Sequence, residues 1–216
     1  MSRVARTGKA GTYTPVQLLW DNTAGDPFVK FEILPTANGG TTDIDTLSLV
    51  QSQLASGSFE GTYAGWSKMI PSSGGTVNMA LYDTVGGAPA TAHDGDGYLA
   101  FNSNVTDGGV QAGAPWEGSE SSAYVATAWL SSQSGTATGS LCLAGLGGTE
   151  ETDSCQPYTV TAGTYTEVQV VYDVPANSSS PNEYGITTLE IQLDAGQGTT
   201  DMDTTSLAQS MGPVSS

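Results

Sequence analysis

Short stretches in which apolar and polar residues alternate run through most of the chain, and turn residues separate them. In one such stretch, Val168, Val170 and Tyr172 fall on the same face of an extended strand. Glu167 and Gln169 fall on the opposite face. No apolar stripe with a helical spacing persists, and Gly, Ser and Asn mark frequent turns. The pattern predicts an all-β sandwich of two packed sheets. Its expected strands cover 76–82, 97–102, 123–130, 139–143 and the repeated segments described next.

Two segments of the chain repeat one another. Residues 10–21, AGTYTPVQLLWD, match 162–173, AGTYTEVQVVYD, and residues 40–49, GTTDIDTLSL, match 198–207, GTTDMDTTSL. The second copy carries six more residues between its two blocks and follows about a hundred residues of other strand-like sequence. We therefore expect three parts. Residues 1–52 form a partial domain that corresponds to the last third of a repeat, residues 53–210 form a complete domain, and residues 211–216 form a short tail.

The partial repeat would expose the apolar face of its strands, which includes Leu18, Trp20, Phe31 and Ile33. Such a face needs a cover, and exposing it costs about 25 cal/mol per Å². The following domain, strands of another copy of the chain, or a preceding part of the same domain could each supply that cover. Completion by another copy gives head-to-tail association and open filaments.

The charge of the chain excludes some partners. The formal net charge is −17, and after Lys68 there are sixteen Asp and Glu residues but no Lys or Arg. This region cannot neutralise phosphates, so we expect no nucleic-acid binding and no binding to anionic membranes. No stretch is long and apolar enough for membrane insertion. The first residues lack the apolar core of a signal peptide, so export needs another route or a signal that this sequence does not contain.

Cys142 and Cys155 are the only cysteines, and they flank a glycine-rich segment. Their spacing does not match a metal site. A disulfide between them would stabilise the domain by roughly 3 kcal/mol and imply an oxidising compartment. The alternative is two separate buried thiols.

Four segments, in order, resemble motifs of carbohydrate-binding modules of the family 4, 9 and 22 type. They are SGSFEGTYAGW at 56–66, DGDGYLAF at 94–101, YVATAWL at 124–130 and MDTTSL at 202–207. The family pattern has Asn where this chain has Ser56, and a second Asp where it has Thr204. The resemblance implies a galactose-binding-like jelly roll, found in extracellular or cell-surface proteins.

The resemblance also implies a structural calcium ion. It assigns the ligands to Glu60, to Asp203 and to the loop that holds Asp94 and Asp96. Calcium takes six to eight hard oxygens, which carboxylates and carbonyls supply. Asp203 lies between apolar residues of an expected strand, and a carboxylate near a core needs a partner. The alternative is a solvated Asp203.

Aromatic residues are the candidates for sugar binding. Sugar rings pack on aromatic planes, and we expect Trp116, Tyr82 and Trp129 to supply them. The alternative is that these side chains belong to the core, as we expect for Trp66. Alternation along the strand puts Tyr124 on the opposite face to Trp129, so at most one of these two faces a groove.

No catalytic motif is present. His93 is the only histidine, and there is neither a nucleophile elbow nor a metalloprotease motif. We therefore expect a non-catalytic extracellular module that binds polysaccharide or cell-surface glycan. The alternative is an assembly module of a fibre or surface protein, whose partners are other copies of the chain.

Overall fold

The computed structural model describes residues 54, 56–83, 91–113, 123–145, 154–173 and 186–210. The chain divides into two units, Met1–Val50 and Gln51–Ser216. All described residues belong to the second unit. The predictions for 1–52 and for Trp116 fall on residues outside the described ranges. In the described part of the chain, no helix has the length and hydrophobicity needed to cross a membrane.

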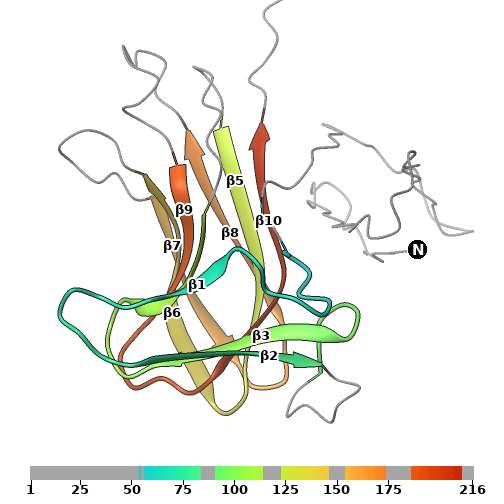
Figure 1. Cartoon of the computed structure of the whole chain (residues 1–216), viewed down its shortest axis with the longest axis vertical. Helices are drawn as coiled ribbons and strands as arrows, with labels where there is room; N and C mark the ends of the chain where they lie inside the picture. Colours follow the sequence, from blue (N-terminus) through green and yellow to red (C-terminus); the bar gives the residue numbers. More distant parts are fainter. Residues whose placement is uncertain are drawn as a thin grey trace, which may run out of the picture. The chain divides into compact units, whose positions relative to one another are not determined.

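The described residues form two antiparallel sheets of five strands each (Figure 1). The strand order of the first sheet is β1-β4-β9-β6-β7, with β1 Trp66–Met69, β4 Gly108–Gly113, β9 Ile186–Leu193, β6 Thr136–Gly145 and β7 Ser154–Thr161. The strand order of the second sheet is β2-β3-β10-β5-β8, with β2 Val77–Asp83, β3 Gly97–Ser103, β10 Thr200–Ser210, β5 Ala123–Ser132 and β8 Thr166–Asp173. The predicted all-β jelly-roll sandwich is confirmed.

The core lies between the two sheets and follows the alternation in the sequence. On β5, Tyr124, Ala126, Ala128 and Leu130 are all buried inside, whereas Trp129 points to the outer face. The first sheet contributes inward-facing side chains from two neighbouring strands, namely Leu141, Leu143, Leu189, Ile191 and Leu193. These apolar side chains supply the main driving force for folding.

Three strands were not expected from the sequence. Strand β1 has only four residues, and β7 contains Pro157, which an edge strand tolerates. Strand β4 begins with two glycines and ends with a third, which suggests a turn. Gly109 is needed because a Cβ there would lie 1.9 Å from the carbonyl oxygen of Ile191 on β9. Close approach of two backbones, rather than a turn, therefore explains this glycine.

The predicted disulfide is confirmed. Cys142 on β6 and Cys155 on β7 lie directly opposite each other in the register of the two strands, and their sulfur atoms are bonded. The bond joins the edge strand β7 to the interior of the first sheet.

Candidate functional site

The outer face of the second sheet carries several polar and aromatic side chains that lie outside the core. One row across this face consists of Tyr82, Tyr98, Asp203, Trp129 and Glu167, and we call it the aromatic–acid row. Tyr82 pairs with Tyr98, Asp203 pairs with Trp129, and Trp129 pairs with Glu167. Met202 pairs with Leu99, so Asp203 lies beside Tyr98. Five strands thus contribute one residue each to a continuous row.

A row of mostly small side chains runs beside it. Ala80, Ala100, Asp201 and Ser131 occupy neighbouring positions on β2, β3, β10 and β5. Asp201 is the only charged residue in this row, and it is completely buried. Its carboxylate therefore lies on the floor of the face, below the larger side chains that flank it.

The next row carries hydrogen-bonding side chains, and we call it the amide row. Asn78 Nδ2 donates to Asn102 Oδ1 at 2.9 Å, and Asn102 Nδ2 donates to Thr199 Oγ1 at 3.4 Å. Gln133 Nε2 reaches into the neighbouring row and donates to Asp201 Oδ1 at 2.8 Å. The small row therefore lies between aromatic rings on one side and amides on the other.

A β-bulge brings the predicted calcium residues together. The pairing of β10 with β5 shifts between Asp203 and Ser206, and within this bulge Thr204 has a φ of 48°. The neighbouring Thr205 N–H donates to the Gly57 carbonyl at 2.7 Å. Because Gly57 is tied to the bulge in this way, the segment that follows it carries Glu60 toward the Asp203 side of the sheet.

The 91–97 loop is held between Glu60 and Asp203. The Asp94 N–H donates to Asp203 Oδ2 at 2.8 Å, and the Asp96 and Gly97 N–H groups donate to Glu60 Oε1 at 3.1 and 3.2 Å. Gly95 has a φ of 64°, and a Cβ there would lie 2.0 Å from Glu60 Oε1. A glycine adopts this positive φ without strain and leaves the Glu60 carboxylate in place.

Two of the four predicted calcium ligands, Glu60 and Asp203, turn their carboxylates toward the same loop, and calcium binding here stays a prediction. Burial raises the pKa of Asp203 to about 7; hydrogen bonds from Asp94, Thr204 and His93 lower it, and the charge of Glu60 raises it. A cation between the Glu60 and Asp203 carboxylates would remove this repulsion. The Asp94 and Asp96 side chains are exposed, and the loop meets the two carboxylates through its backbone. Among the described residues, no three His, Cys, Asp or Glu side chains cluster closely enough to hold a metal ion by themselves.

His93 covers one face of Trp129. The two rings are stacked with centroids 3.9 Å apart and an interplanar angle of 14°, and Tyr165 is tilted against the same imidazole at 5.5 Å. Tyr82 is covered in a similar way by the buried Tyr98, at 5.5 Å and 16°. The structure therefore places two of the three predicted sugar-binding residues, Tyr82 and Trp129, in one row, each with one ring face covered.

Sequence reasoning missed Asp201 and Tyr165. Burial raises the pKa of Asp201 to about 6, although the Gln133 hydrogen bond lowers it. Burial also raises the pKa of the Tyr165 hydroxyl, and the charges of Asp201 and Asp203 raise it further. One signal was available, because the Asp of the Gly-Thr-Thr-Asp block is present in both copies of the repeat, as Asp43 and Asp201.

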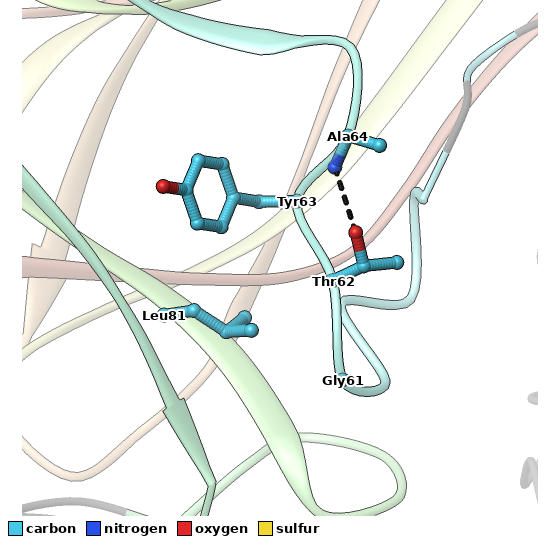
Figure 2. Close-up of a pocket in the computed structure, with 5 residues that line it drawn as sticks. All are labelled: Gly61, Thr62, Tyr63, Ala64 and Leu81. Atoms are coloured by element: carbon cyan, nitrogen blue, oxygen red, sulfur yellow. Dashed lines mark hydrogen bonds between the residues drawn. The ribbon is translucent and has the colours of Figure 1, made fainter.

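A separate shallow pocket of about 260 Å³ lies where the loop before β1 meets β2. Figure 2 shows Tyr63 and Leu81 on its sides and the Thr62 Oγ1 that accepts a hydrogen bond from the Ala64 N–H at 3.1 Å. None of its lining residues, Gly61, Thr62, Tyr63, Ala64 and Leu81, is charged. This pocket offers no acid–base pair.

No protein-family model and no curated protein sequence matches the chain. Solved structures do match it. The CBM22-1 xylan-binding domain of Paenibacillus barcinonensis Xyn10C superposes with a TM-score of 0.58 and 14% identity, covering 77% of this chain and 99% of that one. The CBM22-1-GH10 modules of Clostridium thermocellum Xyn10B, complexed with xylohexaose, match with a TM-score of 0.52 and 16% identity, covering 77% of this chain and 29% of that one.

A different kind of protein shares the architecture. A cyclase from Fischerella sp. TAU, in complex with 4-(1H-indol-3-yl)butan-2-one, matches with a TM-score of 0.57 and 12% identity over 77% of this chain and 100% of that one. The same sandwich therefore occurs in xylan-binding modules and in cyclases. At these identities the comparisons show that the chain has the fold of the CBM22 modules, a jelly-roll β-sandwich.

Proposed function

We propose that the chain is a non-catalytic, extracellular glycan-binding module and that glycans bind on the outer face of its second sheet. The observation that carries this proposal is the aromatic–acid row lying parallel to the amide row, with small side chains between them. Sites for uncharged organic ligands combine apolar and aromatic surface with a few placed polar groups. A sugar needs both, because its ring has apolar C–H faces and its edge carries hydroxyls.

The fold and the disulfide support the proposal. One similar structure comes from an endo-1,4-beta-D-xylanase complexed with xylohexaose and another is a xylan-binding domain, so xylan is the first polysaccharide to test. The Cys142–Cys155 bond suits the oxidising environment outside the cell. The carboxylates of Glu60 and Asp203 both accept hydrogen bonds from backbone N–H groups of the 91–97 loop. We therefore assign them a structural role and no role in catalysis.

Binding to insoluble polysaccharides tests this function. We expect the protein to be depleted from solution by xylan or by another insoluble polysaccharide such as cellulose or mannan. Tyr82→Ala should weaken binding about tenfold, because one aromatic stacking contact is worth about 1 kcal/mol or more. Val171→Ala is the matched control, since Val171 is 47% exposed on β8 and lies outside the three rows. Depletion by none of these polysaccharides, or an equal loss in both variants, would refute the proposed surface.

A second candidate is an assembly module, and the strand order favours it. The segment 10–49 matches the sequence of β8, β9 and β10. Strand β9 lies between β4 and β6, and β10 lies between β3 and β5, so each is an interior strand with two neighbours. Sequences suited to interior strands need partner strands on both edges. We propose that another copy of the chain supplies them.

Light scattering separates the two candidates. If the chain is an assembly module, we expect concentration-dependent oligomers for the whole chain and monomers for a variant that begins at Gln53. If both proteins are monomeric and equally stable, the assembly module is rejected and the glycan-binding proposal is unaffected.

A further inference from the structure

We propose that Asp201 and Tyr165 form a hydroxyl-binding subsite on the outer face of the second sheet, and that His93 occupies the place on Trp129 that the ring of a bound sugar takes. This inference rests on the proposed glycan binding. It adds the atoms that select the ligand and the side chain that the ligand displaces.

The subsite is defined by two buried polar atoms that have no hydrogen-bond partner in the described part of the chain. The Asp201 side chain is 0% exposed, and Gln133 occupies its Oδ1 at 2.8 Å. Among the described residues, neither Asp201 Oδ2 nor the Tyr165 hydroxyl has a hydrogen-bond partner, although both atoms are buried. Three other buried side-chain atoms of the described residues also have no hydrogen bond there, but they belong to residues that face the core, Trp66, Tyr124 and Thr200. Asp201 and Tyr165 face the outer side of the sheet, where a ligand can supply the missing partner.

The strand register places Asp201 and Tyr165 on either side of Ser131. Asp201 pairs with Ser131 on β5, and Tyr165 directly precedes Thr166, which pairs with the neighbouring Leu130. The two side chains are not hydrogen-bonded to each other. A ligand hydroxyl donates one hydrogen bond and accepts others, so it can donate to Asp201 Oδ2 and accept from the Tyr165 hydroxyl. The carboxylate repels an anion. A neutral alcohol such as a sugar hydroxyl fits the pair because it can use both atoms at once.

The aromatic ring beside this pair is already covered. His93 is stacked on Trp129 at 3.9 Å and touches Tyr165 with the same imidazole at 5.5 Å, so the imidazole lies against both rings. His93 is exposed, and its Nδ1 lies 3.5 Å from Thr204 Oγ1, which is a long contact. The loop that carries His93 is held by its backbone through Asp203 and Glu60, so the imidazole can leave Trp129 while the loop stays in place. A sugar ring that binds the hydroxyl pair would then stack on the vacated face.

Titration calorimetry with xylohexaose and with cellohexaose tests the subsite. We expect Tyr165→Phe and Asp201→Asn each to weaken binding about tenfold or more, because each removes one hydrogen bond to the ligand. His93→Ala should strengthen binding about three- to tenfold, since the ligand no longer displaces a stacked ring. Tyr63→Phe is the matched control, because it removes a hydroxyl in the separate pocket of Figure 2.

Thermal unfolding without glycan tests whether Tyr165→Phe weakens binding only because it destabilises the folded protein. Tyr165→Phe removes a buried hydroxyl that has no partner among the described residues, so its melting temperature should equal or exceed that of the unchanged protein. A lower melting temperature would show that the hydroxyl is bonded within the protein, and this would overturn the subsite.

The outcomes separate the subsite from the function. If the unchanged protein binds neither oligosaccharide nor any insoluble polysaccharide, the proposed function and the subsite both fail. If it binds, but Tyr165→Phe and Asp201→Asn bind as Tyr63→Phe does, the pair holds water alone and only the subsite fails. If His93→Ala weakens binding, His93 contacts the ligand and the displacement is wrong.

Discussion

His93 lies flat against Trp129, with ring centroids 3.9 Å apart and planes inclined by 14°. One residue belongs to a loop and the other to the outer face of β5. Their contact joins the loop that Glu60 and Asp203 hold to the surface on which we place glycan binding. The charges of Glu60 and Asp203, which hold the loop, therefore affect the stability of the domain and the position of His93 on this surface at the same time.

The first prediction concerns pH. Burial raises the pKa of Asp201 from 3.8 to about 6 and that of Asp203 to about 7. Their folded pKa values lie above the unfolded ones, so their contribution to stability is full below about pH 4 and is lost as the pH rises toward 7. With chelator present, the melting temperature should fall over this interval, and it should fall less in Asp201→Asn.

The control for this measurement is Asp107→Asn, which also removes one carboxylate but from an exposed residue. Asn tolerates the φ of 61° at this position. Equal slopes for Asp201→Asn and Asp107→Asn would show that general charge repulsion, and not the buried carboxylate, sets the pH dependence.

The second prediction concerns calcium, which we propose binds between Glu60 and Asp203. A ligand that binds only the folded state stabilises it, by about 2.7 kcal/mol at a hundred times its Kd. Exhaustive chelation should therefore lower the melting temperature, and added calcium should restore it. Asp203→Ala should remove this response, while Asp107→Asn should keep it. An unchanged melting curve after chelation would exclude a structural calcium ion.

The third prediction tests the packing of β4 against β9. In Gly109→Ala, the new Cβ meets the Ile191 carbonyl oxygen at 1.9 Å, so the two strands must separate. We expect the free energy of unfolding to fall by roughly 2–4 kcal/mol, as for other overpacked or strained sites. Gly113→Ala lies on the same strand and has no heavy atom within 4 Å of its Cβ, so its effect should stay within about 0.5 kcal/mol. Equal stability of the two variants in urea would contradict this register.

The fourth prediction concerns the disulfide. Thiol titration of the denatured, unreduced protein should find no free sulfhydryl, because the bond between Cys142 and Cys155 accounts for both cysteines of the chain. Reduction should lower the free energy of unfolding by roughly 3 kcal/mol in the loop-entropy model. Two free thiols before reduction would mean that the bond does not form in solution.

Local alternation explains why much of the fold could be predicted. The apolar face of β8 was correctly assigned, and on β5 Tyr124 and Trp129 lie on opposite faces as expected. The cysteine pairing follows from short spacing. Glu60 and Asp203 were brought together only by the resemblance, since they are far apart in the sequence and nothing local connects them.

The rest depends on contacts that no sequence period encodes. Alternation places Asp201 on an outer face, which usually means exposure, yet the structure buries it and Gln133 Nε2 donates to its Oδ1. The position of His93 depends on a loop whose course is set by the Asp94 and Asp96 backbone contacts. The glycines of β4 resemble a turn until the approach of Ile191 is known.

The location of glycan binding is the central claim, and one measurement tests it most directly. Amide and side-chain NMR signals are followed while xylohexaose is added to the isotope-labelled protein. We expect the largest shifts at the Trp129 indole, the Tyr82 amide and the Gln133 side chain, all on the outer face of the second sheet. Gln111 and Gln192 on the first sheet should hardly move. Shifts centred on the first sheet, with none at Trp129, would contradict the account.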